Sequence, residues 1–159
     1  MSVEKVRAFL APFGKAAQIQ EFDVSSATVD LAALAVGVEG ARIAKTLSFK
    51  IGEDPILIVA AGDGKVSNKG FKEFFGFKAK MLAHDQTAEM TGHAVGGVCP
   101  FALPDHVQVY CDESLRRFET VFPAAGSSNS AVEMTPDELY TISGAKAWVK
   151  VCDLPAAEQ

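Results

Sequence analysis

Seven consecutive residues without a charged or polar side chain, PILIVAA at positions 55–61, restrict the folds open to this chain more than any other segment. A strand with one face in water alternates apolar and polar residues, whereas this segment is apolar on both faces. As a helix it would be far too short to cross a bilayer, which takes about 20 residues. We therefore expect a central strand in a sheet that is covered on both sides.

The strand expected just before it, RIAKTLSFK at positions 42–50, carries a lysine in an unusual place. Side chains alternate between the two faces of a strand, so Ile43, Leu47 and Phe49 share a face. Lys45 falls in phase with this apolar set. Because an unpaired buried charge is costly, Lys45 must find a partner, reach a rim of the sheet or face a cavity.

Periodicity and turn residues predict the remaining elements. We expect strands over 19–22, 42–50, 55–61, 78–82, 107–111, 117–122, 131–134 and 147–151. We expect helices over 3–10, from about 29 to 37 with Ser26 or Thr28 as cap, over 69–76 with Ser67 or Asn68 as cap, over 84–91 and from Thr135 onward. The strand over 107–111 should pair with the strand over 117–122 as a hairpin across DESLR.

These elements alternate without a regular βαβ rhythm, and several strands are joined by connections of hairpin length. That pattern favours an α+β (mixed α/β) single domain over a doubly wound parallel sheet. We expect a mixed, mostly antiparallel sheet, curled into a partly open barrel, with short helices around it. The domain should span residues 1–153, and residues 154–159 should form a frayed C-terminal tail.

Composition excludes several classes of protein. A 159-residue chain with 48% hydrophobic and 22% charged residues is typical of a globular domain. Its three cysteines, an odd number without CxxC spacing, indicate a reduced, cytoplasmic protein and make a zinc site improbable. Charged residues near the start argue against a signal peptide. The net charge of −5 argues against bulk electrostatic binding to nucleic acid.

One stretch departs from that negative balance. Between positions 65 and 80, Glu73 is the only acidic residue among five lysines, which are Lys65, Lys69, Lys72, Lys78 and Lys80. They could be a solvated helix face with its neighbouring turns. They could instead be a patch that contacts phosphates and positions an RNA end without reading its sequence.

Two loops rich in small residues could carry chemistry. In HAVGGVCPF at 93–101, Gly96 and Gly97 permit a turn that exposes consecutive backbone N–H groups to an oxyanion, although a tight connection explains them equally well. Cys99 with His93 as its base could form a thiol nucleophile, but a packed cysteine is the better interpretation. The second loop, 126–130, includes serines that could donate into a pocket or serve the turn.

Three features occur in order along the chain: the lysine of IAKTL, the GxxxP loop of Gly96-Gly97-Val98-Cys99-Pro100, and the later AGSSNSAVEMTPDEL segment. In this order they resemble the YbaK / prolyl-tRNA-synthetase-associated domain family. Members of that family deacylate mischarged aminoacyl-tRNAs. The resemblance runs from the SSATVDLAALAVGV helix to the final strand. It implies a metal-independent deacylase without a cofactor, acting on the acceptor end of mischarged tRNA, with prolyl-tRNA synthetase as a further partner and no membrane or DNA.

The resemblance also implies roles for particular residues. Lys45 matches the pocket lysine, and the loop from Gly96 through Gly97, Val98 and Cys99 to Pro100 matches the loop that grips the aminoacyl group. The residues expected to surround the substrate are Phe22, Thr46, Leu47, Phe101, Gly126 and Ser127, and those expected to contact the tRNA are Lys65, Lys69 and Lys72.

One difference between this sequence and part of the family bears on which amino acid the resemblance implies is removed. Family members specialised for alanine on tRNA-Pro carry Asn after the lysine and a late histidine, whereas this chain has Thr46 and no histidine after His106. It is therefore more similar to the cysteinyl-tRNA-Pro deacylase branch. Two alternatives stay open: a non-catalytic module that binds aminoacyl-tRNA or a synthetase through the same pocket, and a hydrolase that depends on Cys99.

Overall fold

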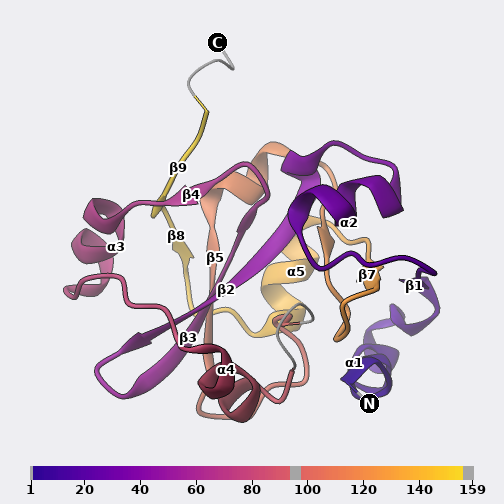
Figure 1. Cartoon of the computed structure of the whole chain (residues 1–159), viewed down its shortest axis with the longest axis horizontal. Coiled ribbons are helices and arrows are strands. Elements are labelled where there is room, and N and C mark those ends of the chain that lie inside the picture. The colour runs from indigo at the N-terminus through magenta and orange to yellow at the C-terminus, as the bar shows by residue number, and fades with distance from the viewer. Residues whose placement is uncertain (1, 94–97, 156–159) are drawn as a thin grey trace.

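The computed structural model describes residues 2–93 and 98–155, and its centre is one open, mixed sheet (Figure 1). The strand order is β6-β2-β3-β5-β8. The β2–β3 hairpin is antiparallel, whereas β6 joins β2, β5 joins β3 and β8 joins β5 in parallel. The strands are β2 (Ile43–Ile51), β3 (Asp54–Ala61), β5 (Gln108–Asp112), β6 (Phe122–Pro123) and β8 (Trp148–Val149). The mixed sheet predicted from the sequence is confirmed, and it does not close into a barrel.

Two short antiparallel ladders flank this sheet. The strand β1 (Ile19–Glu21) pairs with β7 (Ser130–Val132). The strand β4 (Lys65–Val66) pairs with β9 (Cys152–Asp153). Each ladder ties an end of the chain to a segment distant in sequence.

The helices form where the sequence predicts them. They are α1 (Ser2–Leu10), α2 (Val29–Val36), α3 (Asn68–Phe75), α4 (His84–Thr91) and α5 (Pro136–Ser143), with 3-10 turns η1 (Ala11–Phe13), η2 (Ala16–Gln18), η3 (Gly40–Arg42) and η4 (Glu113–Arg117). The side chains of Thr28 and Ser67 cap α2 and α3 by accepting from backbone N–H groups. Thr135 and Glu138 form a reciprocal capping box on α5. None of the helices described is long and apolar enough to span a bilayer.

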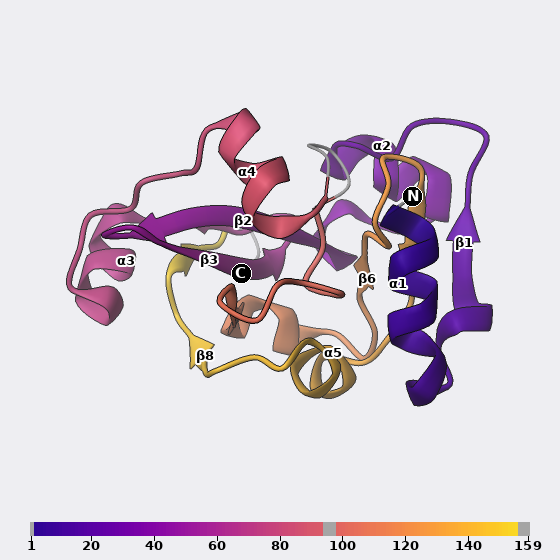
Figure 2. The same ribbon diagram turned by 90° about the horizontal axis from the view of Figure 1, so that it is seen from below.

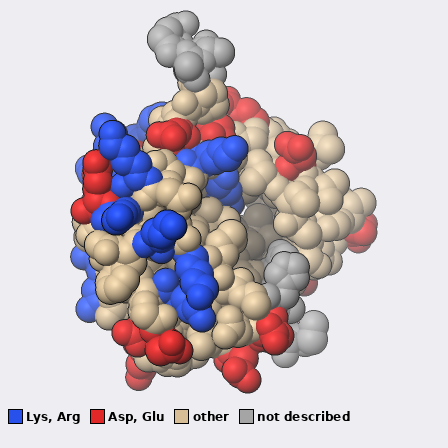
Figure 3. Space-filling view, turned by 60° about the vertical axis from the view of Figure 1, so that its left-hand side comes forward, with Lys and Arg blue, Asp and Glu red and all other residues tan. Residues whose placement is uncertain are grey.

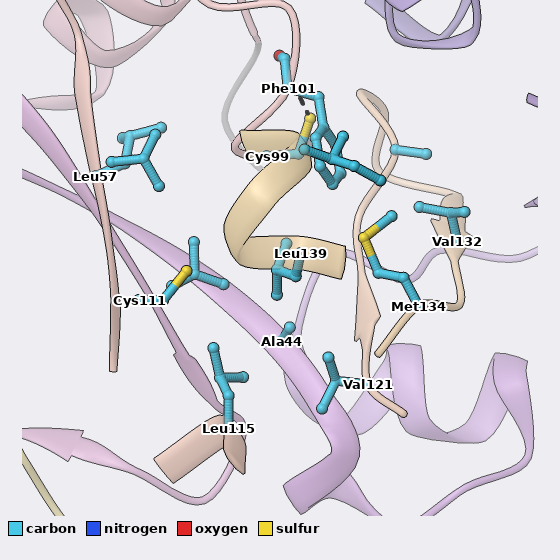
Figure 4. Close-up of a cluster of buried hydrophobic side chains, with 14 of the residues drawn as sticks. Ala44, Leu57, Cys99, Phe101, Cys111, Leu115, Val121, Val132, Met134 and Leu139 are labelled. Carbon is cyan, nitrogen blue, oxygen red and sulfur yellow. Dashed lines mark hydrogen bonds between the residues drawn. The ribbon is translucent and has the colours of Figure 1, made fainter. Parts of the chain in front are cut away.

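The strand β3 is the centre of the core, as the apolar run predicts. Leu57 and Val59 face a cluster that includes Leu139 of α5, shown in part in Figure 4. Ile56 and Ile58 face the opposite cluster, which contains Phe71 of α3. Figure 2 shows the resulting layers, with α2 and α4 on one side of the β2–β3 hairpin and α5 on the other. Burial of both faces explains why the run lacks alternation.

The predicted hairpin between 107–111 and 117–122 is wrong. The buried carboxylate of Asp112 accepts a hydrogen bond from the Ser114 N–H at 2.9 Å and caps η4, so the chain turns away instead of reversing. The later strand β6 then pairs in parallel with β2. The strand expected over 78–82 is reduced to one bridge between Phe49 and Met81.

Candidate functional site

A cavity of about 330 Å³ opens along the edge of β2. Its walls come from β2, the start of α2, the 81–87 segment, Val98 and the β6–β7 region. The lining residues are Ser26, Ala27, Thr28, Val29, Ala32, Ile43, Ala44, Lys45, Thr46, Leu47, Ser48, Met81, Leu82, Thr87, Val98, Phe122, Ala124, Ser130 and Ala131. Most of them are small or carry a hydroxyl, which leaves room for a ligand beside the sheet.

The cavity exists because β2 lacks a neighbour along the middle of its outer edge. At one end Ala44 pairs with Pro123 of β6, and at the other the Leu82 N–H donates to the Ser48 carbonyl at 3.0 Å. Between these points the edge of β2 has no strand partner in the described part of the chain. Backbone groups alternate direction along an antiparallel strand, so the N–H and C=O of Thr46 point outward like those of Ser48. The cavity therefore offers a donor and an acceptor of the backbone to a ligand.

Lys45 both finds polar partners and faces a cavity. Its side chain is half-buried and lines the cavity. Its ammonium donates to the carbonyl of Gly62 at 3.4 Å and to that of Gly64, in the turn between β3 and β4. Both printed partners are backbone oxygens, and no carboxylate of the described residues forms an ion pair with Lys45, so its positive charge can serve an anionic ligand.

The turn that holds Lys45 depends on a glycine. A Cβ placed on Gly62 would lie 2.0 Å from the carbonyl oxygen of Gly40. Only a residue without a side chain allows the turn to come this close to η3. Gly62 therefore fixes the position of one of the two carbonyls that orient the ammonium.

The hydroxyl of Thr46 is the most unusual polar group in the wall. Its Oγ1 is buried and has no hydrogen-bond partner among the described residues. A buried hydroxyl without a partner is destabilising, so such groups in native proteins usually serve a ligand, a water or a catalytic step. Because Thr46 lines the cavity, this unpartnered hydroxyl lies close to whatever enters it, just beneath the accessible surface of the wall.

The second loop closes the far wall of the cavity. The Ser127 hydroxyl lies 2.8 Å from the Ser130 hydroxyl, and Ser130 lines the cavity. Asn129 holds the segment before α2, because its side-chain amide donates to the Phe22 carbonyl at 2.9 Å and its backbone carbonyl accepts from the Phe22 N–H. Ser127 and Phe22 thus support the wall without lining it.

His93 and Cys99 lie together in the core, away from the lining. The Cys99 sulfur is 3.6 Å from His93 Nε2, which also lies 2.7 Å from the Phe101 carbonyl oxygen. A carbonyl oxygen only accepts, so Nε2 carries the proton and is not a base toward the thiol. Burial raises the pKa of Cys99 to about 12 and lowers the pKa of His93 below its usual value. This arrangement does not favour a thiolate nucleophile.

The structure brings together part of the predicted site. Lys45, Thr46, Leu47 and Val98 all line the cavity. Outside the lining lie Phe22, Cys99, Pro100, Phe101, Gly126 and Ser127. Gly96 and Gly97 lie outside the described residues. The lysines Lys65, Lys69 and Lys72 are exposed on and beside α3.

Sequence reasoning missed much of the wall. Ser26 and Thr28 appear in the sequence only as candidate helix caps, although both line the cavity. Met81 and Thr87 come from segments assigned to a strand and a helix without any expected role. All four residues lie near the open edge of β2. That opening depends on where β6 pairs with β2, and no local sequence pattern indicates this pairing. Among the described residues, no group of three His, Cys, Asp or Glu side chains could hold a metal ion.

Comparisons with known proteins give matches along most of the chain. Residues 24–142 match the aminoacyl-tRNA editing domain family. The chain is 52% identical over 153 residues to the uncharacterized protein YwhH of Bacillus subtilis (strain 168), a match that covers 96% of this chain and 98% of the relative. A candidate trans-editing enzyme for prolyl tRNA synthetase matches with a TM-score of 0.86 and 27% identity, over 96% of this chain and 97% of the other. The hypothetical protein APE2540 matches with a TM-score of 0.83 and 28% identity, over 94% and 99%.

Proposed function

This chain belongs to the aminoacyl-tRNA editing domain family, and on that premise we propose that it hydrolyses the ester of a mischarged tRNA as a trans-editing factor. The observation that carries the proposal is Lys45, a residue of the cavity wall beside an open strand edge, whose ammonium is held by the carbonyls of Gly62 and Gly64. The reaction breaks the ester bond between the amino acid and the terminal ribose. Water supplies the atoms that leave a free amino acid and a free ribose hydroxyl.

Lys45 supplies the positive charge in this scheme. Its ammonium supports the terminal adenosine and the ester region, and it counters the negative charge that develops on the ester oxygen. The N–H groups of the loop at Gly96 and Gly97 are the second proposed source of stabilisation. The attacking group is a water, a ribose hydroxyl or the thiol of the substrate itself. Attack by the hydroxyl moves the amino acid to the other ribose oxygen, and attack by the thiol expels the ribose hydroxyl and forms a cyclic thioester; in both cases water then hydrolyses the new bond. Neither Cys99 nor another protein nucleophile is required.

The walls of the cavity favour a small amino acid. Ala32, Ala44 and Ala124 take up little space, and the hydroxyls of Thr46 and Ser130 can hydrogen-bond a polar side chain or the α-amine. A synthetase separates near-isosteric small amino acids by only about 1–3 kcal/mol, so a second site that removes the wrong one has a physical purpose. We propose cysteine on tRNA-Pro as the first substrate to test, prolyl-tRNA synthetase as a partner, and the cytoplasm as the location of both.

A deacylation panel tests this function. Wild-type protein is mixed with tRNA charged with cysteine, alanine, serine or threonine, and ester loss is followed over time. Lys45→Ala is expected to lower the rate on the preferred substrate by about 100-fold or more, as when another preorganised stabilising group is removed. The matched control is Lys50→Ala, because Lys50 lies on the same strand and is also half-buried but does not line the cavity.

The fold should survive the change at Lys45, because the hydrogen bonds of its ammonium go to the backbone of a turn. Wild-type rates in Lys45→Ala, with the denaturation midpoint unchanged, would contradict the proposed role. Tight binding of charged tRNA by the wild-type protein without any ester loss would instead identify a non-catalytic module with the same pocket.

A further inference from the structure

Three large apolar side chains lie unusually exposed in one short segment that leads to the cavity. Phe74 at the end of α3, Phe77 after it and Met81 are 49%, 53% and 59% exposed. Their neighbours in the sequence, Phe71 and Leu82, are buried. We call the surface formed by Phe74, Phe77 and Met81, with the lysines between and beside them, the aromatic strip.

The packing of α3 does not require these side chains. Phe71 fills the core beside Phe49, with ring centroids 5.1 Å apart. Phe75 packs against Phe71 and against Tyr110 at 4.6 and 5.0 Å. Phe74 meets only the edges of this group, at 76° to Phe75 and 73° to Tyr110. Its ring is therefore held in place while about half of the side chain stays in water.

One member of the aromatic strip, Met81, belongs to the wall of the cavity. Met81 also forms a bridge with Phe49 of β2. On either side of it, the Lys80 carbonyl accepts from the Lys50 N–H at 2.9 Å and the Leu82 N–H donates to the Ser48 carbonyl at 3.0 Å. These bonds fix one end of the strip at the rim of the cavity, next to the open edge of β2.

The charges along the strip suit a polyanion. Lys78 and Lys80 are exposed between Phe77 and Met81, Lys72 is exposed just before Phe74, and Glu73 is the only carboxylate between positions 72 and 81. Figure 3 shows lysine and arginine side chains gathered on this face, beside a hollow in the surface. Exposed aromatic rings flanked by cations are the combination that binds unpaired nucleotides, whose bases stack while their phosphates pair with lysines.

We propose that the aromatic strip binds the unpaired 3′-terminal nucleotides of tRNA and leads the aminoacylated end into the cavity. Phe77 and Phe74 offer faces on which bases stack, and Lys78 and Lys80 contact the phosphates next to them, on the side of the cavity. The inference rests on the proposed function for its choice of RNA. It adds a specific mode of binding that depends on single-stranded nucleotides and not on the double-stranded stem.

Binding of uncharged tRNA tests the strip without any need for catalysis. Fluorescence anisotropy measures the affinity for a tRNA with its complete 3′ end and for the same tRNA with the unpaired nucleotides removed. Phe74→Ala/Phe77→Ala is expected to bind the complete tRNA about tenfold more weakly than wild type, as expected for the loss of base stacking. On the trimmed tRNA the two proteins should bind alike.

Two controls keep the result interpretable. Phe13→Ala removes a ring that is 46% exposed and also touches one aromatic neighbour, Phe9 of α1. Figure 2 shows α1 at the other end of the molecule from α3. It should bind both RNAs like wild type. Phe77→Ala alone avoids the contacts that Phe74 makes with Phe75 and Tyr110, and should still weaken binding to the complete tRNA by about threefold or more.

The inference and the proposed function can fail separately. Unchanged affinity of the double variant for complete tRNA would overturn the strip, even if the protein deacylates mischarged tRNA. An equal loss on complete and trimmed tRNA would also overturn it. The inference would also be overturned if the double variant lost binding to prolyl-tRNA synthetase and kept its affinity for tRNA, because the strip would then be a protein interface. If no mischarged tRNA is hydrolysed, a loss confined to complete tRNA still supports the strip.

Discussion

The hydroxyl of Thr46 lowers the stability of the free protein and is a candidate contact for the substrate. Its Oγ1 is buried in the cavity wall and has no partner among the described residues. The neighbouring Lys45, by contrast, has two carbonyl partners. A hydroxyl that costs stability in the free protein can regain it by bonding a ligand, so Thr46 should matter more for substrate than for folding.

Replacing Thr46 with valine isolates the hydroxyl, because the two side chains have nearly the same shape. Thr46→Val is expected to leave the free energy of unfolding unchanged or slightly higher, since it removes a buried group without a partner. It should lower kcat/KM for the preferred substrate by about 2- to 10-fold, the value of one neutral hydrogen bond. Urea denaturation and steady-state deacylation measure the two effects. A loss of stability above about 1 kcal/mol with unchanged kcat/KM would show that the hydroxyl is structural.

At the scale of elements, Asp112 decides where β5 ends and which element comes after it. The side chain is 2% exposed. Its two oxygens accept from the Ser114 N–H at 2.9 Å and the Val151 N–H at 2.8 Å. One carboxylate thus caps η4 and fastens the segment after β8 to the central sheet. This double role directs the chain away from the hairpin that the sequence pattern suggests.

Asp112→Asn tests that role with little change in shape. The amide has one oxygen and one NH₂ group, so one of the two backbone N–H groups would face another donor. The variant is expected to lose about 1–3 kcal/mol of unfolding free energy, the penalty for a buried polar group without a partner. The matched change Asp105→Asn at an exposed loop position should stay within about 0.5 kcal/mol of wild type. Equal urea midpoints for both variants would contradict the anchoring role.

The elements themselves were predictable where local chemistry determines them. Thr135 with Glu138 marks the start of α5, and Thr28 marks that of α2, because capping depends on residues within one turn. The apolar run at 55–61 predicts that β3 is a central strand, because only a strand buried on both faces lacks polar alternation. The partner of β6 was not predictable, since parallel pairing joins segments about 80 residues apart without a turn to reveal it.

The same distinction explains the site. Lys45 stands out in the sequence because its phase conflicts with its charge, a conflict visible within one strand. The lining contributions of Ser26 and Met81 depend on an opening in the sheet edge that no local pattern records. The proposed function rests on the resemblance to the editing family, whereas most residues of the cavity wall became known only from the structure.

At the scale of the whole molecule, charge is distributed unevenly. The chain carries a net charge of −5, yet all five lysines between positions 65 and 80 are exposed, and Figure 3 shows basic side chains gathered on one face. A negative protein that binds RNA must do so through a local patch, because the overall field repels the polyanion. Binding should therefore respond to which lysine is removed and not only to how many.

Two double variants distinguish the effect of the α3 lysines on tRNA binding from the effect of the net charge of the protein. Lys69→Gln/Lys72→Gln and Arg116→Gln/Lys146→Gln each make the protein two charge units more negative, and all four residues are exposed. Only the first pair lies on α3. Each lysine that neutralises a phosphate contributes about 0.7–0.9 to the slope of log affinity against log salt. The α3 variant should therefore bind tRNA more weakly at low salt, with a slope smaller by about 1.5, while the control keeps the wild-type slope. Equal changes in both variants would mean that the overall field, and not the α3 lysines, governs the encounter with tRNA.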